Sequence, residues 1–488
     1  MAQLADIQHN MALCCLNLAD HAGVLAHARA ALSTRPDAPA TRLLQAKAER
    51  QLDSQSPRPQ QTLLDLVRRL DEKPHRNLTA LEHTVMGHAR LDLAEIALNL
   101  DCDAVRSAQW VEPLLGQPAF AERAHLSHII ASLYSRDESD ERFHQRVLDF
   151  ASRHLQAPAQ ASGQPARRRV RSRPRVGIVS PMLHASPLFF LCGEALKALS
   201  TTHDLVFFSR GRKSDWATEV LRGISTEWHA AAGWDTAALY RHEFSAELDV
   251  LLEMGGWMDP DSMRAANGRP AMRQFKWVGG QAMTSGLDCF DGFIADQWQI
   301  PRQAEWLYTE PIVRLKGGYV RFTPPPDFEA ASRRADKGVW GFIGNPVKVV
   351  ADGVNTLQKA IRAHGRPACL RFIDRRYRHA NVVHRIEALF GQSGIPCEFL
   401  APPTNAEFLE EVSRLSAMID TSPYSAGLTA REALGLGVPI LSYPRSKLFS
   451  SLHAKAAIAQ AKSAQRLEPL PLRWLGVRND KSLAAVGE

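Results

Sequence analysis

The sequence lacks the patterns of a disulfide-stabilised or metal-binding protein. Its seven cysteines are odd in number and scattered, without a CxxC pair, and its eighteen histidines include no HExxH motif. These absences argue against a disulfide framework and against a zinc centre, so we expect no metal site.

Long apolar runs are also missing. No stretch approaches the roughly 18 consecutive apolar residues of a membrane-spanning helix. The first twenty residues include Asp6 and His9, and they do not form a basic start followed by an apolar core. We therefore expect a cytoplasmic protein without a membrane span.

The excess of positive charge has little of the pattern of a nucleic-acid binder. The formal net charge is +7, and much of the excess lies in six arginines between residues 167 and 175. Aromatic residues do not interleave with these arginines, and no helix-turn-helix, finger or RNP pattern accompanies them. We expect a flexible basic linker and no nucleic-acid partner; the arginines are Arg167, Arg168, Arg169, Arg171, Arg173 and Arg175.

The 488 residues exceed what one hydrophobic core usually serves, so several domains are expected. Residues 1–155 show helical apolar spacing, and residues 10–36 resemble one tetratricopeptide (TPR) unit that ends at a proline. From residue 174, short β-rich runs alternate with helical stretches, which favours parallel, doubly wound sheets. The predicted parts are a TPR-like helical region (1–155), a Pro/Ala/Arg-rich linker (156–173), two Rossmann-like domains that face a cleft (174–328 and 338–460) and an irregular tail (461–488).

Two segments of the second α/β region predict a nucleotide site. The stretch 419–441 reads as a strand, a small-residue turn, a helix that carries Glu432, and another strand. Amide groups at the start of that helix, near Gly427, Leu428 and Thr429, suit a diphosphate, and Glu432 can reach a ribose hydroxyl. An ordinary βαβ crossover with glycines that only tighten its turns is the alternative for this stretch. An apolar strand that ends in Asn345 and Lys348 adds a cation to the same predicted site.

With these motifs, residues 173 to 455 resemble glycosyltransferase family 41, the SPINDLY and O-linked N-acetylglucosamine transferase group. The resemblance rests on segments that follow one another in the order of the family: 175–181, 274–279 with 284–286, 290–296, 313–315, Asn345 with Lys348, and 419–421 through 437–439. It implies a GT-B fold and an inverting, metal-independent transfer of a sugar, N-acetylglucosamine or a related hexose. The donor would be a nucleotide-diphosphate sugar, preferably UDP-linked, and the acceptor a Ser/Thr hydroxyl of a protein engaged by the helical repeats.

The resemblance also implies roles for individual residues. Lys348 would neutralise the leaving diphosphate, the turn at Thr429 would bind phosphate, and Glu432 would take the position of the ribose-binding carboxylate. Ser186 stands where the family has a histidine, and His184 is the candidate substitute for that catalytic group.

Other departures concern the phosphate turn and the C-terminus. The usual His-Thr-Thr turn is reduced to Gly427-Leu428-Thr429, and after Lys455 the expected closing helices are not evident. Two alternatives to a protein glycosyltransferase therefore stay open. One is a catalytically inactive scaffold, and the other is a transferase that acts on a surface polysaccharide.

Overall fold

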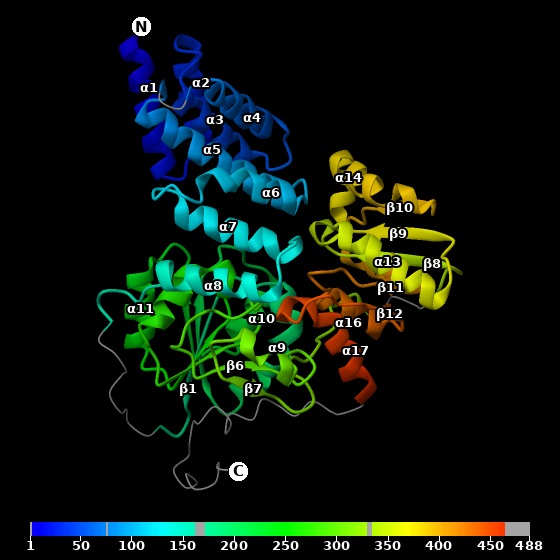
Figure 1. Cartoon of the computed structure of the whole chain (residues 1–488). Coiled ribbons are helices and arrows are strands. Elements are labelled where there is room, and N and C mark those ends of the chain that lie inside the picture. The colour runs from blue at the N-terminus through cyan, green and yellow to red at the C-terminus, as the bar shows by residue number, and fades with distance from the viewer. Residues whose placement is uncertain (1, 75–76, 162–170, 329–333, 464–488) are drawn as a thin grey trace. The chain divides into compact units, whose positions relative to one another are not determined.

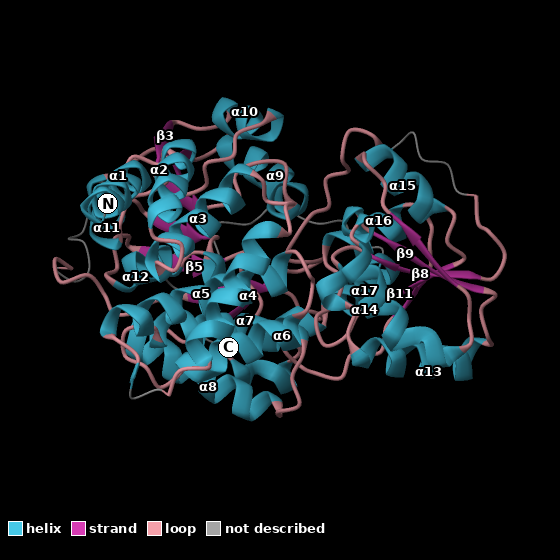
Figure 2. Cartoon of the chain, turned by 90° about the horizontal axis from the view of Figure 1, so that it is seen from above, coloured by secondary structure: helices cyan, strands magenta, loops and turns pink. Residues whose placement is uncertain are grey.

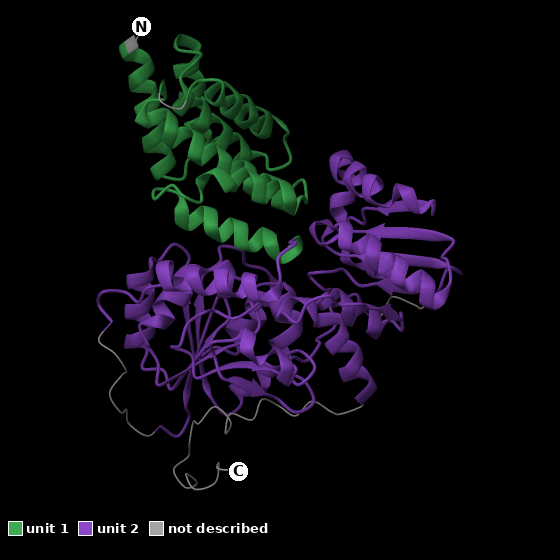
Figure 3. Cartoon of the chain, in the orientation of Figure 1, with its two compact units in different colours: residues 1–135 green, residues 136–488 purple. Residues whose placement is uncertain are grey.

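The computed structural model describes residues 2–74, 77–161, 171–328 and 334–463. It divides into two compact units, residues 1–135 and 136–488 (Figure 3). None of the helices in the described ranges combines the length and the apolar composition needed to cross a bilayer.

The first unit is a succession of antiparallel helices, as the apolar spacing predicts. Small and branched side chains such as Ala46, Leu66 and Ala89 fill the interior between the helices. Thr79 and Glu82 form a reciprocal capping box that fixes the start of α5. The helices are α1 (Ala2–Asn17), α2 (His21–Thr34), α3 (Pro39–Leu52), α4 (Arg58–Asp71), α5 (Ala80–Asn99), α6 (Ala104–Val111) and α7 (Ala121–Tyr134).

The last helix of the predicted helical region belongs to the second unit. Helix α8 (Asp140–His154) lies beyond the unit boundary at Ser135, whereas the sequence places the end of the helical region at residue 155. The Asp140 carboxylate accepts hydrogen bonds from the Ser446 hydroxyl at 2.7 Å and from the Lys447 backbone N–H at 2.8 Å. These contacts tie α8 to the α/β part of the chain.

The first sheet of the second unit is entirely parallel, with the strand order β3-β2-β1-β4-β5-β6-β7. Six of its strands fall on runs that the sequence predicts as strands, at 175–180, 204–209, 248–253, 274–278, 290–295 and 312–315. The edge strand β3 was not predicted, because its residues are half-buried or exposed. The strands are β1 (Arg175–Ser180), β2 (Asp204–Ser209), β3 (Glu227–Ala230), β4 (Val250–Glu253), β5 (Arg273–Lys276), β6 (Gly292–Ala295) and β7 (Ile312–Arg314).

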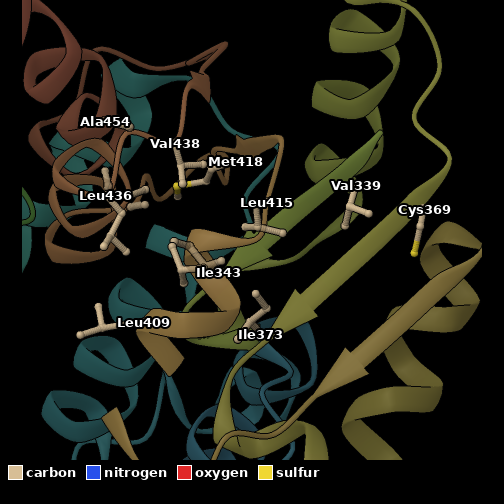
Figure 4. Packing of buried hydrophobic residues seen from close by; sticks show 14 residues of the cluster. Val339, Ile343, Cys369, Ile373, Leu409, Leu415, Met418, Leu436, Val438 and Ala454 are labelled. Carbon is tan, nitrogen blue, oxygen red and sulfur yellow. The ribbon is translucent and has the colours of Figure 1, made fainter. Parts of the chain in front are cut away.

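The second sheet is also parallel, in the order β10-β9-β8-β11-β12. Its core joins strand residues such as Ile343 and Met418 to Leu409, Leu436 and Ala454 from the covering helices (Figure 4). The strands are β8 (Val339–Ile343), β9 (Cys369–Ile373), β10 (Cys397–Leu400), β11 (Ala417–Ile419) and β12 (Ile440–Leu441).

Helices connect most successive strands, the exceptions being β5 to β6 and β6 to β7, and they cover both faces of the sheets, which confirms the predicted doubly wound architecture (Figures 1 and 2). In both sheets the strand order reverses next to the first strand, between β1 and β4 and between β8 and β11. Open parallel sheets bind ligands beyond the carboxyl ends of strands at such a reversal. The connecting helices are α9 (Pro187–Ser200), α10 (Trp216–Gly223), α11 (Thr236–Ser245), α12 (Pro260–Asn267), α13 (Ala351–His364), α14 (Ala380–Phe390), α15 (Asn405–Ser413) and α16 (Leu428–Gly435).

A closing helix follows the second sheet after all. Helix α17 (His453–Ser463) packs Ala454 into the core of the second sheet, and its Gln460 side chain donates a hydrogen bond to the Gly317 carbonyl, beyond β7 of the first sheet. The alanine-rich sequence after Lys455 hid this helix, because small residues suit close packing but form no marked apolar stripe. Residues 464–488, most of the predicted irregular tail, lie outside the described residues, as do residues 162–170 of the predicted linker.

Candidate functional site

A cavity of about 250 Å³ lies within the second unit and is lined by residues from both α/β halves. The first half contributes residues that follow β1, β4, β5, β6 and β7, and the second contributes residues that follow β8, β11 and β12. The lining therefore collects at the carboxyl ends of the strands, where a doubly wound fold binds its ligand. The lining includes Met182, Leu188, Leu191, Met258, Val278, Gln299, Tyr319, Lys348, Tyr424, Gly427, Leu428, Arg431, Phe449 and His453.

Lys348 lies in this cavity, at the end of a short 3-10 helix that follows β8. Its ammonium group donates a hydrogen bond to the Ser425 carbonyl at 3.0 Å and lies 4.3 Å from the centre of the Tyr424 ring. Burial lowers its pKa from 10.5 to about 8, and the charge of Asp420 acts in the opposite direction. The side chain is thus a largely desolvated cation at neutral pH, held against the turn that precedes α16.

Asp420 stabilises that turn through buried hydrogen bonds. Its carboxylate accepts hydrogen bonds from the Ser425 hydroxyl at 2.9 Å, the Ala426 N–H at 2.9 Å and the Ser442 hydroxyl at 2.7 Å. Burial raises the pKa of Asp420 to about 6, although these hydrogen bonds and Lys348 oppose the shift. The residue was not among the predicted site residues, although its place directly after a buried strand was a usable indication.

The start of α16 supplies the backbone part of the site. Gly427, the residue before the helix, and Leu428, its first residue, both line the cavity next to Lys348. Thr429 does not line the cavity, because its side chain lies against Gly344 at the end of β8. The predicted association of a lysine with a helix N-terminus is therefore present in the structure.

Two other predicted contact residues lie beside the cavity without lining it. Asn345 is half-buried, and its side-chain oxygen accepts the Val347 N–H at 3.1 Å, which caps the short helix that carries Lys348. Glu432 is 4% exposed, and burial raises its pKa to about 7. Their predicted roles toward the nucleotide stay predictions.

The histidine proposed as a catalytic group has no position in the cavity wall. His184 is half-buried between Met182 and Pro187, which do line the cavity, and its Nδ1 atom is buried without a hydrogen bond. Burial lowers the pKa of His184, so the imidazole is neutral at pH 7. Ser186, at the family's histidine position, donates its hydroxyl to the Met182 carbonyl at 2.8 Å and is 4% exposed.

The structure also brings in residues that the sequence reading did not include. Arg431 and His453 line the same cavity as Lys348, from α16 and from the first turn of α17. Burial lowers the pKa of His453 to about 3, with further lowering by Lys348 and Arg431, so its imidazole is neutral. Arg431 precedes the predicted Glu432 by one residue, but spacing alone did not show which of the two side chains faces the cavity.

The wall contributed by the first half is mostly apolar. Met182, Leu188, Leu191, Met258 and Val278 form it, and the lining as a whole contains no carboxylate. Charge is thus concentrated on the side of the second sheet. In the part of the chain that the structure describes, no three His, Cys, Asp or Glu side chains come together in a way that could hold a metal ion.

Comparisons with known proteins agree with this architecture. No protein-family model matches the chain. The chain is 23% identical over 344 residues to a Solanum lycopersicum protein named probable UDP-N-acetylglucosamine–peptide N-acetylglucosaminyltransferase SPINDLY, a match that covers 66% of this chain and 36% of that protein. A Petunia hybrida protein of the same name is 23% identical over 381 residues, with 74% and 39% covered. The chain thus spans little more than a third of the length of these relatives.

Among solved structures, a mutant O-GlcNAc transferase from Thermobaculum terrenum shares the fold. The TM-score is 0.77 at 21% identity, and the match covers 98% of this chain and 89% of the other. Helical repeats followed by two parallel α/β sheets around a cavity define a GT-B glycosyltransferase architecture. Within that class, the chain is a distant homologue of the SPINDLY and O-GlcNAc transferase group, as its motifs predict.

Proposed function

We propose that the protein is an inverting, metal-independent transferase that moves a sugar from a nucleotide diphosphate to a serine or threonine hydroxyl of a protein. The observation that carries this proposal is the position of Lys348 in the cavity. Its ammonium group is held at the Ser425 carbonyl, beside Gly427 and Leu428 at the start of α16. A half-buried cation next to a helix N-terminus suits a phosphate-bearing ligand.

The chemistry of sugar transfer explains why these groups matter. The acceptor oxygen forms a bond to the anomeric carbon while the bond from that carbon to the phosphate oxygen breaks, and the nucleotide diphosphate leaves with the bonding electrons. Negative charge grows on the leaving group as the bond breaks. A preorganised ammonium group and backbone N–H groups stabilise this charge without rearranging, and they act more strongly where water is excluded.

The remaining predicted residues have supporting roles in this proposal. Thr429 packs against Gly344 and supports the turn proposed to bind phosphate. Asn345 caps the short helix that carries Lys348, and Glu432 is the candidate to bind the ribose hydroxyls. His184 is the candidate acceptor of the hydroxyl proton, and for that role it has to turn from its buried position toward the cavity.

The relatives' names support UDP-N-acetylglucosamine as the donor and a peptide as the acceptor. The first unit also has a surface suited to a peptide. A groove of about 560 Å³ there combines the apolar side chains of Leu64, Val67 and Trp110 with charged side chains of both signs, among them Arg68 and Glu72. Such a groove fits an acceptor segment that carries both apolar and polar residues.

Calorimetric titration with UDP and UDP-N-acetylglucosamine tests the donor site. A charge-assisted hydrogen bond contributes about 1.5–3 kcal/mol, so Lys348→Ala is expected to weaken UDP binding by roughly 10- to 150-fold. Lys359→Ala removes an exposed lysine from α13 and serves as the matched control with unchanged affinity. Absence of binding heat with the wild-type chain would support the scaffold alternative and overturn the proposal.

The acceptor needs a separate assay. Incubation of cell extract with the protein and a donor labelled in its sugar is expected to transfer label to protein, in an amount that Lys348→Ala reduces strongly. Label that enters only polysaccharide would contradict the protein acceptor and support the alternative of a surface polysaccharide.

A further inference from the structure

Arg431 is a cation of the cavity that forms no ion pair with any described residue. It lies on α16, four residues after Gly427, and lines the same cavity as Lys348. Burial lowers its pKa, against the opposing effect of Tyr319 and Asp296, but a guanidinium remains charged in a protein. Because this half-buried cation has no carboxylate partner among the described residues, its place in the cavity points to an anionic ligand.

The Asp296 carboxylate, whose charge acts on Arg431, is already engaged elsewhere. The Asp296 carboxylate accepts the backbone N–H groups of Trp298 at 2.9 Å, Gln299 at 2.7 Å and Tyr319 at 3.1 Å. These bonds hold Asp296 in the loop that follows β6. Asp296 thus attracts the guanidinium without forming an ion pair with it, and the positive charge of Arg431 stays available to a ligand.

Gln460 fixes the direction of the guanidinium. Its side-chain oxygen accepts a hydrogen bond from Nη1 of Arg431 at 2.8 Å, while its side-chain nitrogen donates to the Gly317 carbonyl at 2.9 Å. Only the nitrogen of an amide can donate to a carbonyl, so the second bond sets the amide orientation and presents the oxygen to Arg431. One of the five guanidinium N–H groups is thereby used to position the side chain.

His453 adds a polar group without adding charge. It lies seven residues before Gln460, two turns earlier on α17, and its ring approaches the position that a Cβ on Gly427 would take, at 3.9 Å. Its ring also contacts Tyr424 and Phe449. Because its imidazole is neutral, the positive charge at this end of the cavity comes from Lys348 and Arg431.

We infer that Arg431, positioned by Gln460, is a second phosphate-binding cation that acts with Lys348 on the diphosphate of the donor. This inference rests on the proposed function. The planar fork of a guanidinium matches two phosphate oxygens, whereas an ammonium acts as a point charge, so the two cations suit a ligand with two adjacent phosphates. Arg431 then stabilises the leaving diphosphate during transfer and binds the free nucleotide diphosphate afterwards.

The test compares UDP with uridine, which lacks both phosphates, by titrating the full chain. We expect Arg431→Met to weaken UDP binding by about 10- to 100-fold with uridine affinity changed by less than twofold. Gln460→Leu should weaken UDP binding by about threefold to tenfold, since the arginine keeps its charge but loses its anchor. The exposed Arg362, replaced by Met, is the control with unchanged affinity for both.

Thermal unfolding separates this role from a structural one. Since Arg431 has no ion pair to lose, the melting temperature of ligand-free Arg431→Met should stay close to the wild-type value, while the rise caused by saturating UDP shrinks. UDP affinity of Arg431→Met within twofold of wild type would overturn this inference and leave the proposed function standing. Failure of the wild-type chain to bind UDP would overturn the proposed function, and this inference with it.

Discussion

Glu432 provides a sharp test of the electrostatics around the site. The side chain is 4% exposed, and burial raises its pKa from 4.5 to about 7. The folded protein therefore keeps a proton on Glu432 that the unfolded chain releases above pH 4.5. For an acid whose folded pKa is raised, stability is lost as pH rises from the unfolded pKa to the folded pKa.

The magnitude follows from the two pKa values. A shift of one unit corresponds to about 1.4 kcal/mol, so the full penalty above pH 7 is about 3 kcal/mol, and about 1 kcal/mol of it is already present at pH 5. Glu432→Gln keeps the shape of the side chain and removes its titration. We expect this variant to gain about 2.5 kcal/mol in free energy of unfolding, relative to wild type, between pH 5 and pH 8.

Urea unfolding at both pH values measures this gain. Tryptophan fluorescence, to which Trp340 on β8 contributes, follows unfolding, and other titrating groups cancel because both proteins contain them. Glu410→Gln, at an exposed position on the neighbouring helix α15, is the matched control and should show no such trend. A gain for Glu432→Gln below about 0.5 kcal/mol, or one that is larger at pH 5, would refute the reasoning.

Three further predictions follow from other residues of the site. UDP affinity should fall by up to tenfold per pH unit above about pH 8, because Lys348, whose pKa is lowered to about 8, loses its charge; a flat profile in titration calorimetry between pH 8 and 9.5 would contradict this. Asp420→Ala leaves the buried hydroxyls and the N–H that it binds without an acceptor, so we expect a loss of at least about 3 kcal/mol in urea unfolding, and an unchanged midpoint would contradict the role of Asp420. Gly280 has a φ of +58°, and an added Cβ would meet the Gly255 carbonyl oxygen at 2.2 Å, so Gly280→Ala should lower the melting temperature measurably, whereas Gly391→Ala, with open space around its position, should have little effect.

Most of the fold was predictable because its elements are set by local patterns. Apolar runs such as 175–180 and 369–373 bury both faces of a parallel strand, and this requirement makes them visible without knowledge of their neighbours. The edge strand β3 and the alanine-rich α17 lacked such patterns, since one is half-buried and the other packs through small side chains. Their existence depends on partners that are distant in the sequence.

The candidate site was likewise predictable only in part from the sequence. The lysine after β8 and the small-residue turn before α16 were identified from the sequence, because both follow strands and strand ends meet at one edge of a parallel sheet. The sequence did not show that Arg431 faces the cavity while the adjacent Glu432 is buried, since neighbouring helical positions differ by about 100° and only packing decides which one turns inward.

The sequence by itself therefore determined the class of fold, the order of its elements and the cation next to a helix N-terminus. The tertiary structure decided which side chains share a cavity. Gln460 and Gly317 are far apart in the chain, yet together they orient Arg431, and α17 brings His453 to the turn that lacks a side chain at Gly427. Such pairings depend on how helices pack on the sheets, which short-range patterns of residues do not encode.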